Sequence, residues 1–230
     1  MAKKYLEFEQ DGVKYNLYDM PDGFVIKGDL DLEDLEGCGI SKLPDLSKVI
    51  VEGNFNCGGT NITNLKGSPK KVGGNFWCDD CTKLKSLKGA PREVGGSFIC
   101  EGCSITDLEG APKVVGGNFY CRFENYLLSS LQGAPQKVGG KFDCNGDFEE
   151  KYGLRSGFSV EDLHKSPLYI EEKKQKKIDA KLKDLRNKVM RTIAAENVSP
   201  QKGVTNKKRP VAVKKGIKRM LDGIGKSIDK

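Results

Sequence analysis

The sequence repeats itself with a period of about 22 residues, and this restricts the fold more than its composition does. Each full copy reads Gly-Ala-Pro or Gly-Ser-Pro, then Val-Gly-Gly, then Phe-x-Cys. Four full copies begin at Gly67, Gly89, Gly110 and Gly133. Two degenerate copies precede them, at residues 26–32 and 51–57, so about six copies follow one another at intervals of 21 to 25 residues. One copy cannot bury its own apolar edge, whereas stacked copies share a core, so the repeat predicts a solenoid.

Within a copy the apolar residues have the period of a strand. Val72, Gly74, Phe76 and Cys78 alternate with the residues between them, which predicts a short strand with Phe and Cys on its buried face. Two further apolar positions follow, and Gly-Ala-Pro then reverses the chain. The Gly-Gly pairs precede strands in every full copy, so we assign them to close packing or turn geometry rather than to phosphate binding. We predict a mainly-β solenoid over residues 25–150.

The repeat also carries a resemblance. The run from Phe98 to Leu108 is similar to the leucine-rich-repeat consensus, in which two apolar strand positions precede Asn or Cys and then Leu. The combination of Gly-Ala-Pro, Val-Gly-Gly and Phe-x-Cys resembles a subfamily of leucine-rich-repeat-like proteins encoded by tailed bacteriophages. The resemblance covers residues 25–150 and implies no particular activity. If the protein is phage-encoded, we expect it in the virion and the host cytoplasm. Otherwise we expect it in the cytoplasm.

The segments beside the repeat have patterns of their own. Residues 1–24 contain two alternating runs separated by Asp11-Gly12, which predicts a hairpin with a tight turn that caps the first edge of the solenoid. Residues 151–170 form a second cap or a short helix that begins near Ser159. No apolar stretch at the start is typical of a secretion signal, and no apolar run is long enough for a membrane-spanning helix.

Residues 171–230 form a basic tail. They contain 19 Lys and Arg against 7 Asp and Glu, so of the net charge of +7 the tail supplies +12 and the first 170 residues −5. We predict a helix at 171–197 from an apolar stripe that includes Ile178, a linker at 198–212, and a basic amphipathic helix from Lys214 to Ile228. The candidate residues for docking or polyanion binding are Lys207, Lys208, Arg209, Lys214, Lys215, Ile217, Lys218, Arg219, Leu221 and Ile224.

The eight cysteines invite a metal-site interpretation. The pairs Cys78-x-x-Cys81 and Cys100-x-x-Cys103 have the spacing of a four-cysteine zinc site. The repeat gives a simpler explanation, because Cys78 and Cys100 occupy a position where Leu32 stands in the first copy, which requires a small buried apolar group. Cys38, Cys81 and Cys103 fall at the consensus position where Asn or Cys satisfies a turn, and Thr60 replaces them in another copy. We expect reduced thiols, no metal and no cofactor.

Catalysis is the least favoured function. The one histidine, His164, lies outside the repeat in an irregular stretch, and no cysteine has an evident activating partner. We therefore expect a protein that is not an enzyme.

The residue between Phe and Cys provides the candidate binding site. In successive copies it is Asp31, Asn56, Trp77, Ile99, Tyr120 and Asp143. Stacking aligns the three large side chains in the middle of a polar row, and exposed apolar residues of this kind mark interfaces. Arg122 and Phe123 extend the site. The alternative is that these side chains pack beneath a cap or against the apolar face of the tail.

These features predict a scaffold for protein–protein interactions, and the resemblance to phage-encoded proteins implies a structural or assembly component of a phage particle. Its partners would be other proteins, including particle components present in several copies. Two alternatives remain open. One is a phage factor that binds and inhibits a host protein. The other is a nucleic-acid-associated protein that binds through residues 171–230, although the tail contains no base-reading motif.

Overall fold

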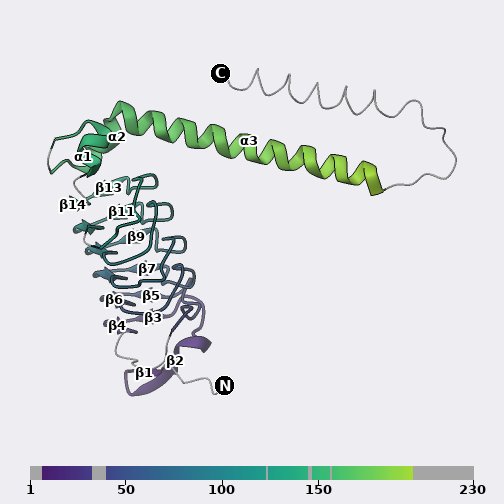
Figure 1. Ribbon diagram of the computed structural model, residues 1–230. Helices are drawn as coiled ribbons and strands as arrows, with labels where there is room; N and C mark the ends of the chain where they lie inside the picture. Colours follow the sequence, from purple (N-terminus) through teal and green to yellow (C-terminus); the bar gives the residue numbers. More distant parts are fainter. Residues whose placement is uncertain (1–6, 33–39, 123, 145–146, 156, 199–230) are drawn as a thin grey trace, which may run out of the picture. The chain divides into compact units, whose positions relative to one another are not determined.

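The computed structural model describes residues 7–32, 40–122, 124–144, 147–155 and 157–198 (Figure 1). The chain divides into two compact units, Met1–Ile170 and Glu171–Lys230. The first unit contains the repeat, and the second contains most of the helix α3 (Pro167–Val198).

The first unit begins with the predicted hairpin. β1 (Glu7–Gln10) pairs antiparallel with β2 (Val13–Asn16), and a 3₁₀ helix, η1 (Leu17–Asp19), follows. The turn residues Asp11 and Gly12 have φ angles of 54° and 74°, the positive values that a tight hairpin turn requires.

Two parallel sheets follow the hairpin, and each coil of the chain adds one strand to each sheet (Figure 1). The first sheet contains β3 (Val25–Ile26), β5 (Ile50–Val51), β7 (Lys71–Val72), β9 (Glu93–Val94), β11 (Val114–Val115) and β13 (Lys137–Val138). The second sheet contains β4 (Leu30–Asp31), β6 (Phe55–Asn56), β8 (Phe76–Trp77), β10 (Phe98–Ile99), β12 (Phe119–Tyr120) and β14 (Phe142–Asp143). In the described residues each sheet contains six strands, and the chain completes about five full coils between the first and the last of them, which confirms the predicted mainly-β solenoid.

The predicted single strand per copy is wrong in one respect. Val72 and Phe76 belong to two separate strands of two residues each, β7 and β8, in different sheets. The chain bends at Gly73 and Gly74 between them. Both glycines lie close against the coil below, since a Cβ atom built on Gly73 would lie 2.2 Å from the backbone oxygen of Glu52. The alternation of apolar residues therefore continues through a corner rather than along one strand.

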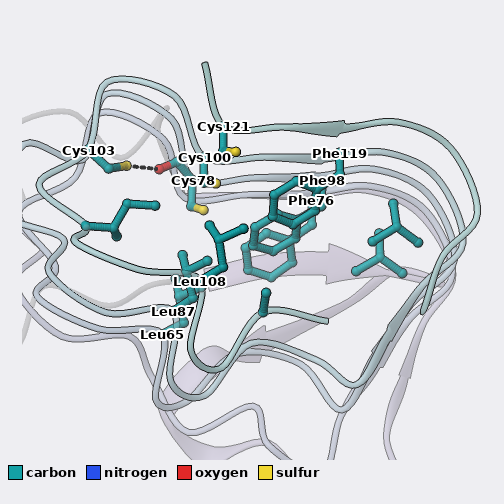
Figure 2. Close-up of a cluster of buried hydrophobic side chains, with 14 of the residues drawn as sticks. Leu65, Phe76, Cys78, Leu87, Phe98, Cys100, Cys103, Leu108, Phe119 and Cys121 are labelled. Atoms are coloured by element: carbon teal, nitrogen blue, oxygen red, sulfur yellow. Dashed lines mark hydrogen bonds between the residues drawn. The ribbon is translucent and has the colours of Figure 1, made fainter. Parts of the chain in front are cut away.

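Identical side chains stack inside the coils (Figure 2). The buried phenylalanines of the second sheet form a ladder with ring centroids 5.0 to 5.4 Å apart. Its members are Phe55, Phe76, Phe98, Phe119 and Phe142. The cysteines that follow them and the leucines on the opposite wall, including Leu65, Leu87 and Leu108, form parallel ladders. Burial of each phenylalanine contributes roughly 1.5–3 kcal/mol, so the core energy is distributed along the stack.

Side chains close the N-terminal edge of the solenoid. The Nε2 of Gln10, in the hairpin, donates to the backbone oxygen of Val25 at 3.1 Å. The Oε1 of Gln10 accepts from the backbone N–H of Lys27 at 2.8 Å. Gln10 thus hydrogen-bonds the outer edge of β3, and Phe8 and Tyr15 pack on the Phe24 ring. This confirms the predicted N-terminal cap.

Helices close the other end. α1 (Asp147–Tyr152), α2 (Val160–Lys165) and the first residues of α3 follow the last coil. The ring of Phe158 extends the phenylalanine ladder, with its centroid 6.0 Å from that of Phe142. α2 begins as predicted, because Ser159 and Asp162 form a reciprocal capping box.

The second unit is described as far as Val198. The helix predicted at 171–197 is present, and it starts four residues earlier, at Pro167, a position where proline costs no hydrogen bond. On the predicted stripe Ile178 is partly exposed, and Leu182 is 38% exposed. Beyond Val198, the predicted linker and basic helix lie outside the described residues, as do all ten tail-docking candidates from Lys207 to Ile224. No helix in the described part of the chain is long and apolar enough to cross a membrane.

Candidate protein-binding face

The predicted row of side chains exists on the second sheet. Strand pairing places Trp77 beside Ile99 and Ile99 beside Tyr120. Asp31, Asn56 and Asp143 continue the same row at its two ends. Because the residue before and the residue after each of them point into the core, the row faces outward. We call Trp77, Ile99 and Tyr120 the apolar strip.

The members of the strip are partly exposed. Neighbouring strands lie about 4.8 Å apart, so three successive strands place these side chains within roughly 10 Å. The strip is therefore a contiguous apolar patch on an otherwise polar row.

Carboxylates follow the strip on one side. Asp79 and Glu101 lie two residues after Trp77 and Ile99, and both are partly exposed. Partial burial raises the pKa of Glu101, and the neighbouring carboxylates of Asp143 and Asp79 raise it further. Asp31 and Asp143 lie in the same row as the strip. We call Asp31, Asp79, Glu101 and Asp143 the acidic border.

A ladder of polar side chains holds the other edge of the strip. The Oδ1 of Asn54 accepts the backbone N–H of Asn75 at 2.8 Å, and the Oδ1 of Asn75 accepts that of Ser97 at 2.7 Å. The same bond joins every successive coil of the second sheet, through Asp29, Asn54, Asn75, Ser97, Asn118 and the N–H of Lys141. The Nδ2 of Asn118 also donates to the Tyr120 hydroxyl at 2.9 Å, which fixes the orientation of that ring.

Sequence reasoning missed this ladder. The available signal was the recurrence of Asp, Asn or Ser directly after the Gly-Gly pair or its equivalent. Each acceptor belongs to one coil and its donor to the next, so the bond becomes recognisable only when the coils are placed in register.

The two predicted extensions of the strip have different outcomes. Arg122 is exposed, and its Nη1 lies 3.8 Å from Oδ1 of Asp143, so it partly neutralises the acidic border at the last coil. Phe123 lies outside the described residues. Away from the strip, in the segment between β12 and β13, two apolar residues that the sequence did not single out are exposed: Tyr126 at 84% and Leu127 at 57%. The sequence feature that could have indicated them is a run of three apolar residues, Tyr-Leu-Leu, of which only Leu128 is buried.

The thiols of the apparent zinc motif point to different backbone oxygens. Cys78 Sγ donates to Ile99 O at 3.3 Å and Cys100 Sγ to Tyr120 O at 3.5 Å. Burial raises the pKa of both thiols well above its ordinary value, which favours the protonated donor. Within the described residues, no group of three or more His, Cys, Asp or Glu side chains is arranged to hold a metal ion.

The second cysteine position has the role that the repeat consensus indicates. Cys103 Sγ donates to Cys78 O at 3.2 Å (Figure 2), and Cys81 Sγ donates to Cys57 O at 3.2 Å. In the next coil Asn125 takes this place and donates to the backbone oxygens of Cys100 and Cys121. These residues therefore satisfy turn carbonyls, as predicted. Cys38 lies outside the described residues.

His164 lies on α2, so its predicted placement in an irregular stretch is wrong. The capping box at Ser159 stabilises the start of a helix there, although that helix is only six residues long. The His164 Nε2 lies 2.8 Å from the backbone oxygen of Pro135, which requires a proton on this nitrogen. The ring also contacts Tyr169, with centroids 5.4 Å apart. His164 thus closes the last coil.

Comparison with protein-family models, curated proteins and solved structures finds no match to this chain. The apolar strip, its acidic border and its polar ladder therefore provide the basis for assigning a function.

Proposed function

We propose that this protein is a non-enzymatic scaffold for protein–protein interactions that docks through the outer face of its second sheet. The observation that carries the proposal is the apolar strip, because Trp77, Ile99 and Tyr120 align on three paired strands without being buried. Aromatic side chains are typical anchors of interfaces, since they bury a large area at a small cost in side-chain entropy.

The buried groups support a scaffold rather than a catalyst. The thiols of Cys78 and Cys100 lie in the core with raised pKa values, where they are poor nucleophiles. The His164 Nε2 is engaged with a backbone oxygen. These three side chains thus have structural roles.

We further propose that the scaffold is a structural or assembly component of a phage particle, which rests on the resemblance of the repeat to proteins of tailed bacteriophages. The basic tail, with 19 Lys and Arg against 7 Asp and Glu, would add a second, electrostatic attachment. The same charge supports the alternative of a nucleic-acid partner for the tail, whose binding would weaken steeply with salt.

Quantitative mass spectrometry of purified particles tests this proposal. Particles from cells that produce the wild-type chain or Trp77→Ala would be compared with the soluble fraction of the same cells. We expect the wild type at a fixed ratio to the known particle proteins, and the variant depleted from particles at an unchanged soluble level. Absence of the wild type from particles would refute the virion role and leave a host-protein-binding role.

A further inference from the structure

The two sheets of the solenoid carry opposite charge. At or directly before the strands of the first sheet, the exposed charged residues are mainly basic: Lys70, Lys71, Arg92, Lys113 and Lys137. Glu52 and Glu93 are the acidic exceptions on the described part of this side. On the second sheet the described charged residues are mainly acidic, namely Asp29 and the acidic border, and the basic exceptions are Arg122 and Lys141 at the last coils. The apolar strip therefore lies on the acidic side of the solenoid.

This arrangement selects among the partners that a scaffold could bind. A phosphate backbone or an anionic membrane surface would be repelled by Asp31, Asp79, Glu101 and Asp143. A neutral apolar surface would cover the strip, but it would also desolvate the carboxylates beside it and bring no cation to offset that cost. A protein segment that combines cations with an apolar anchor satisfies both parts of the face at once.

Resting on the proposed function, we infer that the partner of the second sheet is a Lys- or Arg-rich protein segment with an aromatic or aliphatic anchor. The anchor covers the strip at Trp77 and Ile99, and the cations lie over Asp79 and Glu101 beside it. Asn118 of the polar ladder holds the Tyr120 ring in one orientation before binding, so little ordering cost remains for that side chain.

The raised pKa of Glu101 agrees with this partner. Its carboxyl is partly desolvated, and the negative charges of Asp143, two coils further on, and of Asp79, on the preceding coil, raise its pKa, while Arg122 acts in the opposite direction. A cation placed over the border would favour the ionised form that these neighbours disfavour.

The experiment is a selection of random peptides displayed on yeast against the full-length chain. The selection is run in parallel on the wild type and on Trp77→Ala, so that peptides bound by other parts of the chain appear in both and are discarded. Two matched double variants follow. Asp79→Asn with Glu101→Gln removes two carboxylates beside the strip, and Glu52→Gln with Glu93→Gln removes two from the opposite sheet. Thermal unfolding confirms that each variant is folded.

We expect the peptides that require Trp77 to be enriched in Lys and Arg and to contain an aromatic or aliphatic residue. For the most enriched peptide, resynthesised and measured by fluorescence anisotropy, Trp77→Ala should weaken binding about tenfold or more. The variant of the acidic border should weaken it about threefold to tenfold, and the opposite-sheet variant should leave it unchanged.

Two results would overturn the inference and separate it from the proposed function. Peptides that require Trp77 but show no excess of basic residues, or that respond equally to the two double variants, would refute a basic partner and leave the scaffold role. Absence of any peptide that requires Trp77 would refute both.

Discussion

At the scale of single residues, each position of a coil is defined by the same position of the coil below it. The second glycine of each Gly-Gly pair shows this most clearly. A Cβ atom on Gly96 would lie 2.4 Å from Oδ1 of Asn75 and 2.7 Å from the backbone carbon of Gly74. Gly28, at the equivalent position of the first coil, has nothing within 4 Å of its own Cβ position. The requirement for glycine therefore arises from stacking.

Gly96→Ala should destabilise the protein by about 1–3 kcal/mol, because the added methyl group must displace backbone of the preceding coil. Gly28→Ala is the matched control and should change the stability little, or raise it by up to about 1 kcal/mol through a less flexible unfolded chain. Urea unfolding of the two variants measures both values. Equal destabilisation by the two substitutions would contradict the role of stacking.

The sequence predicted which residues are buried better than it predicted their bonds. Phenylalanine and cysteine at fixed repeat positions could only be core, and the consensus place of Cys103 indicated its turn carbonyl. The ladder through Asn75 could not be read in the same way, because its donor and acceptor lie in different coils.

At the scale of elements, the two ends of the solenoid are closed by side chains that hydrogen-bond exposed backbone. Gln10 does this for β3. At the other end, the backbone N–H of Leu131 donates to the Tyr152 hydroxyl at 3.2 Å, and the Tyr169 hydroxyl donates to Leu131 O at 3.3 Å. Both tyrosines and Leu131 are buried, so water cannot replace these bonds at low cost.

Tyr152→Phe should therefore cost about 1–3 kcal/mol, because it leaves the buried N–H of Leu131 without its acceptor. Tyr126→Phe removes the same hydroxyl from a side chain that is 84% exposed and should change the stability by less than about 0.5 kcal/mol. Chemical denaturation compares the two. A Tyr152→Phe protein as stable as Tyr126→Phe would show that the helical cap does not support the last coil.

The elements that the sequence predicted correctly have local signals. Asp11-Gly12 marks the hairpin turn, and Ser159 with Asp162 marks the start of α2. The division of each expected strand into two had no local signal, since Val72 and Phe76 keep the spacing of one strand while the chain turns a corner between them.

At the scale of the whole first unit, parallel stacking converts a repeated sequence into continuous surfaces. It places Trp77, Ile99 and Tyr120 side by side and separates acidic from basic residues between the two sheets. The strip was predictable because one repeat position holds all three residues. The charge separation was not, because it required the corner at each Gly-Gly pair that assigns neighbouring residues to different sheets.

The central claim is that the face of the second sheet binds a protein partner. Photo-crosslinking tests it most directly, with a benzophenone amino acid in place of Ile99 on β10 or, as the control, in place of Glu93 on β9 of the same coil. We predict a discrete protein adduct from position 99 in the cells that naturally produce the chain, reduced by Trp77→Ala and absent from position 93. A folded protein that gives no adduct at position 99, or equal adducts at both positions, would contradict the account.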